Sequence, residues 1–119
     1  MDIDQAKLEA FMGKMIGHMT GGMICYGVWL GDEFGLYREM AGSGPRTADA
    51  VAAKTGCHPR LVREWLDGQA AGGLIAYDHA TGAYELSAEA ALALADDASP
   101  DQHARAETPG PLSQCLIWC

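Results

Sequence analysis

The stretch TADAVAAKTGCHPRLVREWLDGQAAGGLIAYDHATGAYEL, residues 47–86, decides the fold. Thr47 can cap a first helix, because its hydroxyl can accept an unpaired N–H of the first turn. Gly56 suits the end of that helix, where the backbone tends to adopt positive φ. Pro59 fits the first turn of a second helix, since an N–H would be unpaired there anyway. The apolar residues of this second helix recur at helical spacing: Leu61, Val62, Trp65, Leu66 and Ala70.

The second half of the stretch predicts a two-stranded hairpin. Gly72-Gly73 ends the helix, and the run LIAY at 74–77 has the composition of a short strand. A turn that closes with glycine follows at 78–82, and 84–86 form the return strand. Helix, turn, helix and hairpin in this order indicate a winged helix. We therefore predict a mainly α fold, a winged helix-turn-helix with a two-stranded β-wing.

Two helices are expected before the winged helix and one after it. The apolar patterns predict helices over 2–19 and 23–41, with a break at Thr20-Gly21-Gly22. A short helix over 88–95, capped by Ser87, follows the wing. This reading divides the chain into an N-terminal helical pair at 1–42, a winged helix-turn-helix at 43–98, and a disordered or aberrant tail at 99–119.

Glycines recur every four residues in both N-terminal helices: Gly13, Gly17 and Gly21, then Gly27, Gly31 and Gly35. Each glycine costs a helix about 1 kcal/mol relative to alanine, so close packing of the backbones is expected in return. Packing inside the chain and packing across a subunit interface would both satisfy this pattern. We expect a homodimer, because these helices carry more apolar surface than a small winged helix can cover. The candidate interface residues are Phe11, Met15, Met19, Gly17 and Gly31.

Aromatic residues suggest a second kind of site. Tyr26 and Trp29 stand three residues apart, so they share one helical face and would line an apolar substrate pocket. The competing interpretation is that they are ordinary core residues. Trp65 shares a helical face with other apolar residues, and we predict that it lies in the core.

Charge argues against a general nucleic-acid binder. The 119 residues carry a net charge of −8, whereas affinity for nucleic acid comes largely from neutralising phosphates. If the chain were instead a small DNA-binding regulator, Arg60 and Arg63 would make the contacts. Each has a carboxylate four residues on, at Glu64 and Asp67, so little positive potential remains and we do not expect DNA binding.

The sequence gives little support for a metal site, a catalytic site or a membrane span. The four cysteines form no C-x-x-C pair, so no zinc site is predicted. The histidines have no nucleophile or carboxylate partner at a convincing spacing, and we assign no catalytic or metal-binding residues. The uncharged run at 16–31 is too short and too glycine-rich for a membrane span. With no signal peptide, a cytoplasmic protein is expected.

Three segments together resemble the N-terminal region of bacterial class I S-adenosylmethionine-dependent methyltransferases. They are LGDEFGLYREMAGSGPRTADAVAAKTG at 30–56, VREWLDGQAAGGLIAYDHATGAYEL at 62–86, and LADDASP at 94–100. The V-R-E-W-L segment and the Y-D-x-x-T-G-x-Y wing are the more specific parts. The resemblance implies a winged-helix module that dimerises, followed in a full-length parent by a catalytic domain that binds S-adenosylmethionine.

The 19 residues after Pro100 contain no strand, glycine-rich loop and helix of the kind that binds this cofactor. We therefore expect a truncated or frame-shifted member of the family, or a stand-alone accessory domain. On this reading the chain holds no cofactor and has no methyltransferase activity alone. Its function would be that of an interaction and dimerisation domain.

Overall fold

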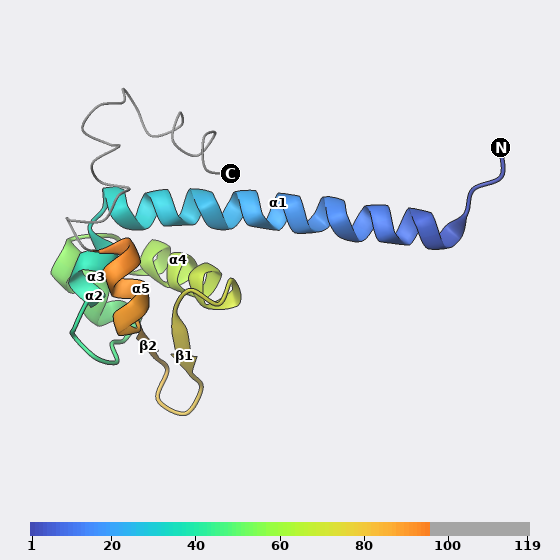
Figure 1. Ribbon diagram of the computed structural model, residues 1–119. Helices are drawn as coiled ribbons and strands as arrows, with labels where there is room; N and C mark the ends of the chain where they lie inside the picture. Colours follow the sequence, from blue (N-terminus) through green and yellow to red (C-terminus); the bar gives the residue numbers. More distant parts are fainter. Residues whose placement is uncertain (96–119) are drawn as a thin grey trace, which may run out of the picture.

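The computed structural model describes residues 1–95, and the tail predicted at 99–119 lies outside them. A long helix, α1, projects from a compact body formed by the other elements (Figure 1). Along the chain the elements are α1 (Gln5–Glu33), α2 (Leu36–Met40), α3 (Ala48–Thr55), α4 (Pro59–Ala71), β1 (Ala76–Asp78), β2 (Ala83–Glu85) and α5 (Ala88–Leu94). The predicted fold class, a mainly α winged helix-turn-helix with a two-stranded wing and two preceding helices, is confirmed.

The predicted ends of the two central helices are confirmed. The Thr47 hydroxyl accepts a hydrogen bond from the Ala50 N–H at 3.2 Å. Gly56 ends α3 with φ of 70°, a left-handed conformation that glycine adopts without steric cost. Pro59 opens α4, and the imidazole of His58 accepts from the Arg60 N–H at 3.2 Å. Local capping chemistry therefore fixes the helix-turn-helix.

The wing is an antiparallel hairpin in which Tyr77 pairs with Tyr84. Its strands lie within two residues of the predicted ones at each end. One further strand partner was not predicted: the N–H and C=O of Arg46 exchange hydrogen bonds of 2.8 and 2.7 Å with Tyr84. This bridge ties the loop before α3 to the wing.

The predicted break at Thr20-Gly21-Gly22 is wrong, because α1 runs without interruption to Glu33. Glycine lowers helix stability without forbidding helical φ and ψ, so paired glycines are a weak signal for a helix end. The chain instead turns at Gly35, whose φ is 68°. A left-handed residue stops the helix where the sequence predicted that it would continue.

The core lies where α2, α3, α4 and the wing meet. The prediction for Trp65 is confirmed, since it is only 9% exposed. Leu61 does not belong to the apolar face on which we placed it: it is 68% exposed, on the flank of α4. The buried core cluster comprises Leu36, Tyr37, Met40, Ala48, Val51, Ala52, Val62, Trp65, Leu66, Ile75, Tyr84 and Leu86. Among the described residues, no helix is long and apolar enough to cross a membrane.

Candidate functional site

The most unusual surface of the molecule is an apolar stripe along α1. Every residue from 1 to 23 is exposed, because this part of α1 extends beyond the body (Figure 1). Eight large apolar side chains between residues 8 and 26, each 38–71% exposed, follow the helical period and so lie on one face. We call this face the α1 stripe: Leu8, Phe11, Met12, Met15, Ile16, Met19, Met23 and Tyr26.

The C-terminal part of α1 packs tightly on α4 at two glycines, Gly27 and Gly31, which have no side chain to separate the helices. A Cβ atom on Gly31 would lie 2.4 Å from Cζ2 of Trp65 and 2.5 Å from Cε2 of Tyr37. The Trp65 indole N–H donates to the Gly27 carbonyl at 2.7 Å. Tyr37 meets Trp65 edge to face, with ring centroids 5.0 Å apart. Together with Ile24, whose side chain lies against Gly72, these contacts hold the C-terminal part of α1 on the body.

A buried polar pair accompanies this packing. The Tyr37 hydroxyl donates to Oε1 of Gln69, and both side chains are almost fully buried. Burial, together with the nearby charge of Asp32, raises the pKa of Tyr37. Gln69 also lies over Gly27, where an added Cβ would come within 2.6 Å of its amide nitrogen. Sequence reasoning missed this pair, because Tyr37 and Gln69 are 32 residues apart and neither position carries a local signal.

An apolar groove of about 920 Å³ opens between α1 and α4. We call it the α1–α4 groove. One wall comes from α1 and the turn after it, and includes Met23, Tyr26, Leu30 and Phe34. The other wall comes from α4 and the α3–α4 turn: Thr55, Gly56, Cys57, His58, Leu61, Val62, Glu64, Trp65, Gly68, Gln69, Ala71 and Gly72. The volume matches the range of small-molecule sites, and the lining is mostly apolar.

Of the two aromatic residues expected in a substrate pocket, one lines this groove. Tyr26 is 44% exposed and forms part of the α1 wall. Trp29 does not line the groove, but it contacts Tyr26 with ring centroids 5.4 Å apart. The proposed substrate contacts of both residues stay a prediction.

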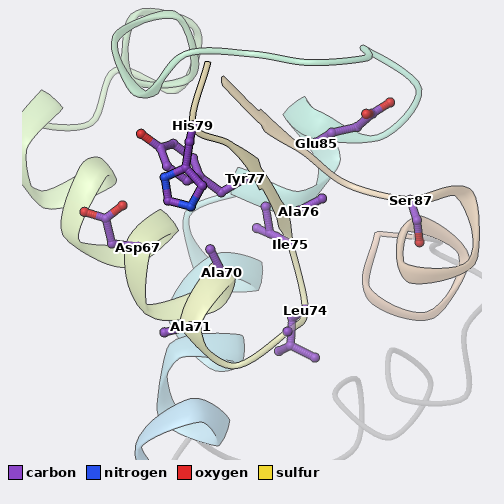
Figure 2. Close-up of a pocket in the computed structure, with 11 residues that line it drawn as sticks. Asp67, Ala70, Ala71, Leu74, Ile75, Ala76, Tyr77, His79, Glu85 and Ser87 are labelled. Carbon is purple, nitrogen blue, oxygen red and sulfur yellow. The ribbon is translucent and has the colours of Figure 1, made fainter. Parts of the chain in front are cut away.

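A second cavity, of about 980 Å³, lies under the wing. Tyr77 and His79 lie together at one end of it, with ring centroids 4.8 Å apart, whereas Glu85 and Ser87 lie apart from them (Figure 2). Asp67 lies on the same side as Tyr77 and His79, so the polar side chains of this cavity are divided between two places (Figure 2). Among residues 1–95, no group of three or more His, Cys, Asp or Glu side chains could hold a metal ion.

The residues assigned to the alternative DNA interface lie on the exposed side of α4. Arg60 forms the expected pair with Glu64, at 3.9 Å. Asp67, the expected neighbour of Arg63, accepts a hydrogen bond from the Tyr84 hydroxyl at 2.5 Å. α1 packs along one flank of the same helix, where Ile24 touches Gly72. Two acidic residues thus accompany the arginines on the surface that would face DNA.

The residues assigned to a dimer interface separate into two groups. Phe11, Met15 and Met19 belong to the α1 stripe. Gly17 is exposed, and nothing lies near the position of its missing Cβ. Gly31 is buried against Trp65 and Tyr37 of its own chain, so it packs inside the chain and not on the exposed stripe.

Several solved structures share this fold. The mitomycin 7-O-methyltransferase MmcR is 26% identical with a TM-score of 0.73, over 85% of this chain and 30% of its own. Human N-acetylserotonin methyltransferase, solved with S-adenosylmethionine, is 22% identical with a TM-score of 0.63, over 83% of this chain and 28% of its own. PigF, solved with SAH, is 21% identical with a TM-score of 0.62, over 76% and 25%. The last two likenesses show the fold alone.

This chain spans about 30% of the length of MmcR. No curated protein matches it. The Rv2258c-like winged HTH domain matches residues 22–96, which begin near the end of the α1 stripe and include the whole winged helix. This match includes α2–α5 and the wing. Because it extends over more than half of the sequence, the chain belongs to the family of Rv2258c-like winged helix-turn-helix domains.

Proposed function

We propose that this chain is the winged-helix interaction and dimerisation domain of an S-adenosylmethionine-dependent methyltransferase. On this proposal a separate catalytic domain of the parent enzyme binds the cofactor and the methyl acceptor, and this chain alone transfers no methyl group. The likeness to MmcR supports the methyltransferase context. The single observation that carries the interaction role is the α1 stripe.

The size of the stripe supports a homodimer. Eight large side chains, each 38–71% exposed, present an apolar area of the order of the about 800 Å² per partner that a standard interface buries. Apolar patches on monomers rarely exceed a few hundred Å². A two-fold dimer is the commonest assembly in which a surface patch is covered by the same patch of a second copy.

The stability of α1 leads to the same proposal. Residues 5–23 form about 28 Å of helix with no tertiary support from the described body. They contain Gly13, Gly17, Gly21 and Gly22, each of which costs about 1 kcal/mol relative to alanine. In proteins most helical stability comes from the tertiary packing of an apolar face, and the apolar face of this segment is exposed. Contact with a second copy would supply the missing packing.

The test is the mass of the chain in solution, measured by light scattering and sedimentation over a wide range of concentration. We expect a dimer at micromolar concentration, and a monomer for Met19→Asp, which places a charge in the middle of the stripe. Ala10→Asp is the matched control, since Ala10 is also exposed but lies on the opposite face of the helix by its spacing. A wild-type chain that stays monomeric at the highest concentrations would refute the proposal.

A further inference from the structure

We propose that the α1–α4 groove binds a neutral, largely apolar small molecule, and that the side-chain amide of Gln69 donates a hydrogen bond to an oxygen of this ligand. The proposal goes beyond the interaction role proposed above and does not depend on the dimer. It combines three features of the groove: an unpaired donor at its base, walls of apolar and aromatic side chains, and a lining without Lys or Arg among the described residues.

Gln69 presents an unpaired hydrogen-bond donor at the base of the groove. It lines the groove although the residue is only 2% exposed. Its Oε1 accepts the hydrogen bond from the Tyr37 hydroxyl, whereas its Nε2 donates to no other residue within 1–95. Since buried amide groups are nearly always hydrogen-bonded, the free Nε2 indicates a place for an acceptor from outside the chain.

The position of Nε2 is set by the contact between the two helices. A Cβ on Gly27 of α1 would come within 2.6 Å of this nitrogen, so the amide of Gln69 lies directly against the glycine. Gly27 lines the groove as well. Nε2 therefore lies where the α1 wall and the α4 wall meet.

The walls above this donor favour a flat apolar ligand. Aromatic rings come from three segments, at Tyr26 of α1, Phe34 of the turn after it, and Trp65 of α4. Phe34 is 56% exposed, and Leu61 on the opposite wall is 68% exposed. A ligand between them would remove apolar surface from water on both sides. Apolar walls with a few placed polar groups are the usual composition of small-molecule sites.

The charges of the lining favour a neutral ligand. Among the described residues that line the groove there is no Lys or Arg, and Glu64 contributes a carboxylate. An anionic ligand would meet this carboxylate without a lysine or arginine to pair with. A carbonyl or ether oxygen accepts a hydrogen bond from an amide N–H without bringing a charge. We therefore assign the groove to a neutral aromatic compound that carries such an oxygen.

The first test uses two probes that differ by one oxygen. Indanone is a neutral bicyclic ketone, and indane has the same ring system with a methylene in place of the carbonyl. Each is titrated into the isotope-labelled chain and followed by NMR. We expect both probes to shift signals of residues that line the groove, and indanone alone to move the side-chain amide protons of Gln69 downfield. Shifts confined to other parts of the chain, or no shifts, would overturn the proposal.

The second test removes the donor. Gln69→Leu is combined with Tyr37→Phe, because replacing both partners of a buried hydrogen bond leaves no polar group unpaired. We expect the ratio of the indanone affinity to the indane affinity to fall roughly two- to tenfold in this double variant, the usual range for one neutral hydrogen bond. An unchanged ratio would show that Gln69 does not contact the ligand oxygen.

The third test fills the groove. Gly68 lines it and has open space at the Cβ position, so Gly68→Leu would place a side chain in the groove without a collision at Cβ. Gly13→Leu is the matched control, on the exposed part of α1 and also in open space. We expect Gly68→Leu to lose binding of both probes and the control to keep it. Equal binding by the two variants would contradict the assignment of the site.

A further arm of this test excludes a second copy as the occupant. The probes are titrated into Met19→Asp, the variant designed above to be monomeric, and we expect it to bind them as the wild type does. Binding by Met19→Asp alone would mean that a second copy fills the groove in the wild type, and the small-molecule proposal would fall. Because the probes bind irrespective of assembly on this proposal, a monomeric wild type that binds them would refute only the dimer.

Discussion

Tyr84 connects three parts of the molecule through one side chain and its backbone. Its N–H and C=O pair with Arg46, its ring lies 4.7 Å from that of Tyr77, and its hydroxyl donates to Asp67 of α4. Burial, followed by the hydrogen bond to Asp67, raises the pKa of Tyr84 to about 12 from the ordinary 10.0. The neutral phenol is therefore the form that the fold stabilises.

This shift predicts alkaline destabilisation. Because the folded pKa lies above the unfolded one, the contribution of Tyr84 to stability is fully present below pH 10.0 and is lost as the pH rises toward about 12. We expect the free energy of unfolding to fall across this interval, as measured by urea denaturation at a series of pH values. Tyr84→Phe should be less stable at neutral pH and should lose less over the same interval. A parallel pH dependence for the two proteins would contradict this account.

At the scale of elements, α1 contains two kinds of glycine. A Cβ on Gly27 or Gly31 would come within 2.6 Å of Gln69 or 2.4 Å of Trp65, whereas Gly13, Gly17, Gly21 and Gly22 have open space at the Cβ position. The first kind permits close helix packing inside the chain. The second kind only lowers the stability of the projecting helix.

Two alanine substitutions separate these roles. We expect Gly31→Ala to destabilise the chain by about 1–3 kcal/mol, the usual range for overpacking, because the new methyl group would collide with Trp65 and Tyr37. Gly17→Ala, the matched control, should raise helix stability by up to about 1 kcal/mol. Thermal and urea unfolding followed by circular dichroism measures both. The idea fails if Gly31→Ala is as stable as the wild type.

The parts of the fold that follow local rules could be predicted from the sequence. Thr47, Gly56 and Pro59 mark helix ends by their own chemistry, and the structure uses each as expected. The course of α1 could not be predicted in the same way, because a glycine in a helix costs only about 1 kcal/mol and neighbouring hydrogen bonds override it. The left-handed backbone at Gly35 carries no signal that distinguishes it from the other glycines.

The candidate site was predicted in part. Phe11, Met15 and Met19 were identified by apolar spacing, and all three lie on the α1 stripe. The spacing did not show which glycines face inward, since Gly31 shares the four-residue repeat with glycines in open space. The α1–α4 groove could not be predicted from the sequence, because its walls come from segments about 30 residues apart. Only tertiary packing brings Tyr26 near Leu61.

For the molecule as a whole, the charge predicts whether it binds DNA. The net charge is −8, and Arg60 on the exposed side of α4 is paired with Glu64. We expect no sequence-specific binding to duplex DNA at physiological salt, because few phosphates can be neutralised. Fluorescence anisotropy with random and selected duplexes checks this. A nanomolar complex whose affinity falls steeply with added salt would instead support a regulatory winged helix.

The contact between α1 and the body at Gly27 and Gly31 also affects where the far end of the helix lies. From Gly27 to Gln5 the helix extends about 33 Å, so a tilt of about 10° at the glycines would swing its tip by about 6 Å. The packing of Gly27 and Gly31 against Gln69 and Trp65 therefore fixes the direction in which the long helix leaves the body. A substitution that displaced the Trp65 ring would therefore have its largest effect on position at the far end of α1. The course of a 29-residue helix thus depends on close packing at two residues that have no side chain.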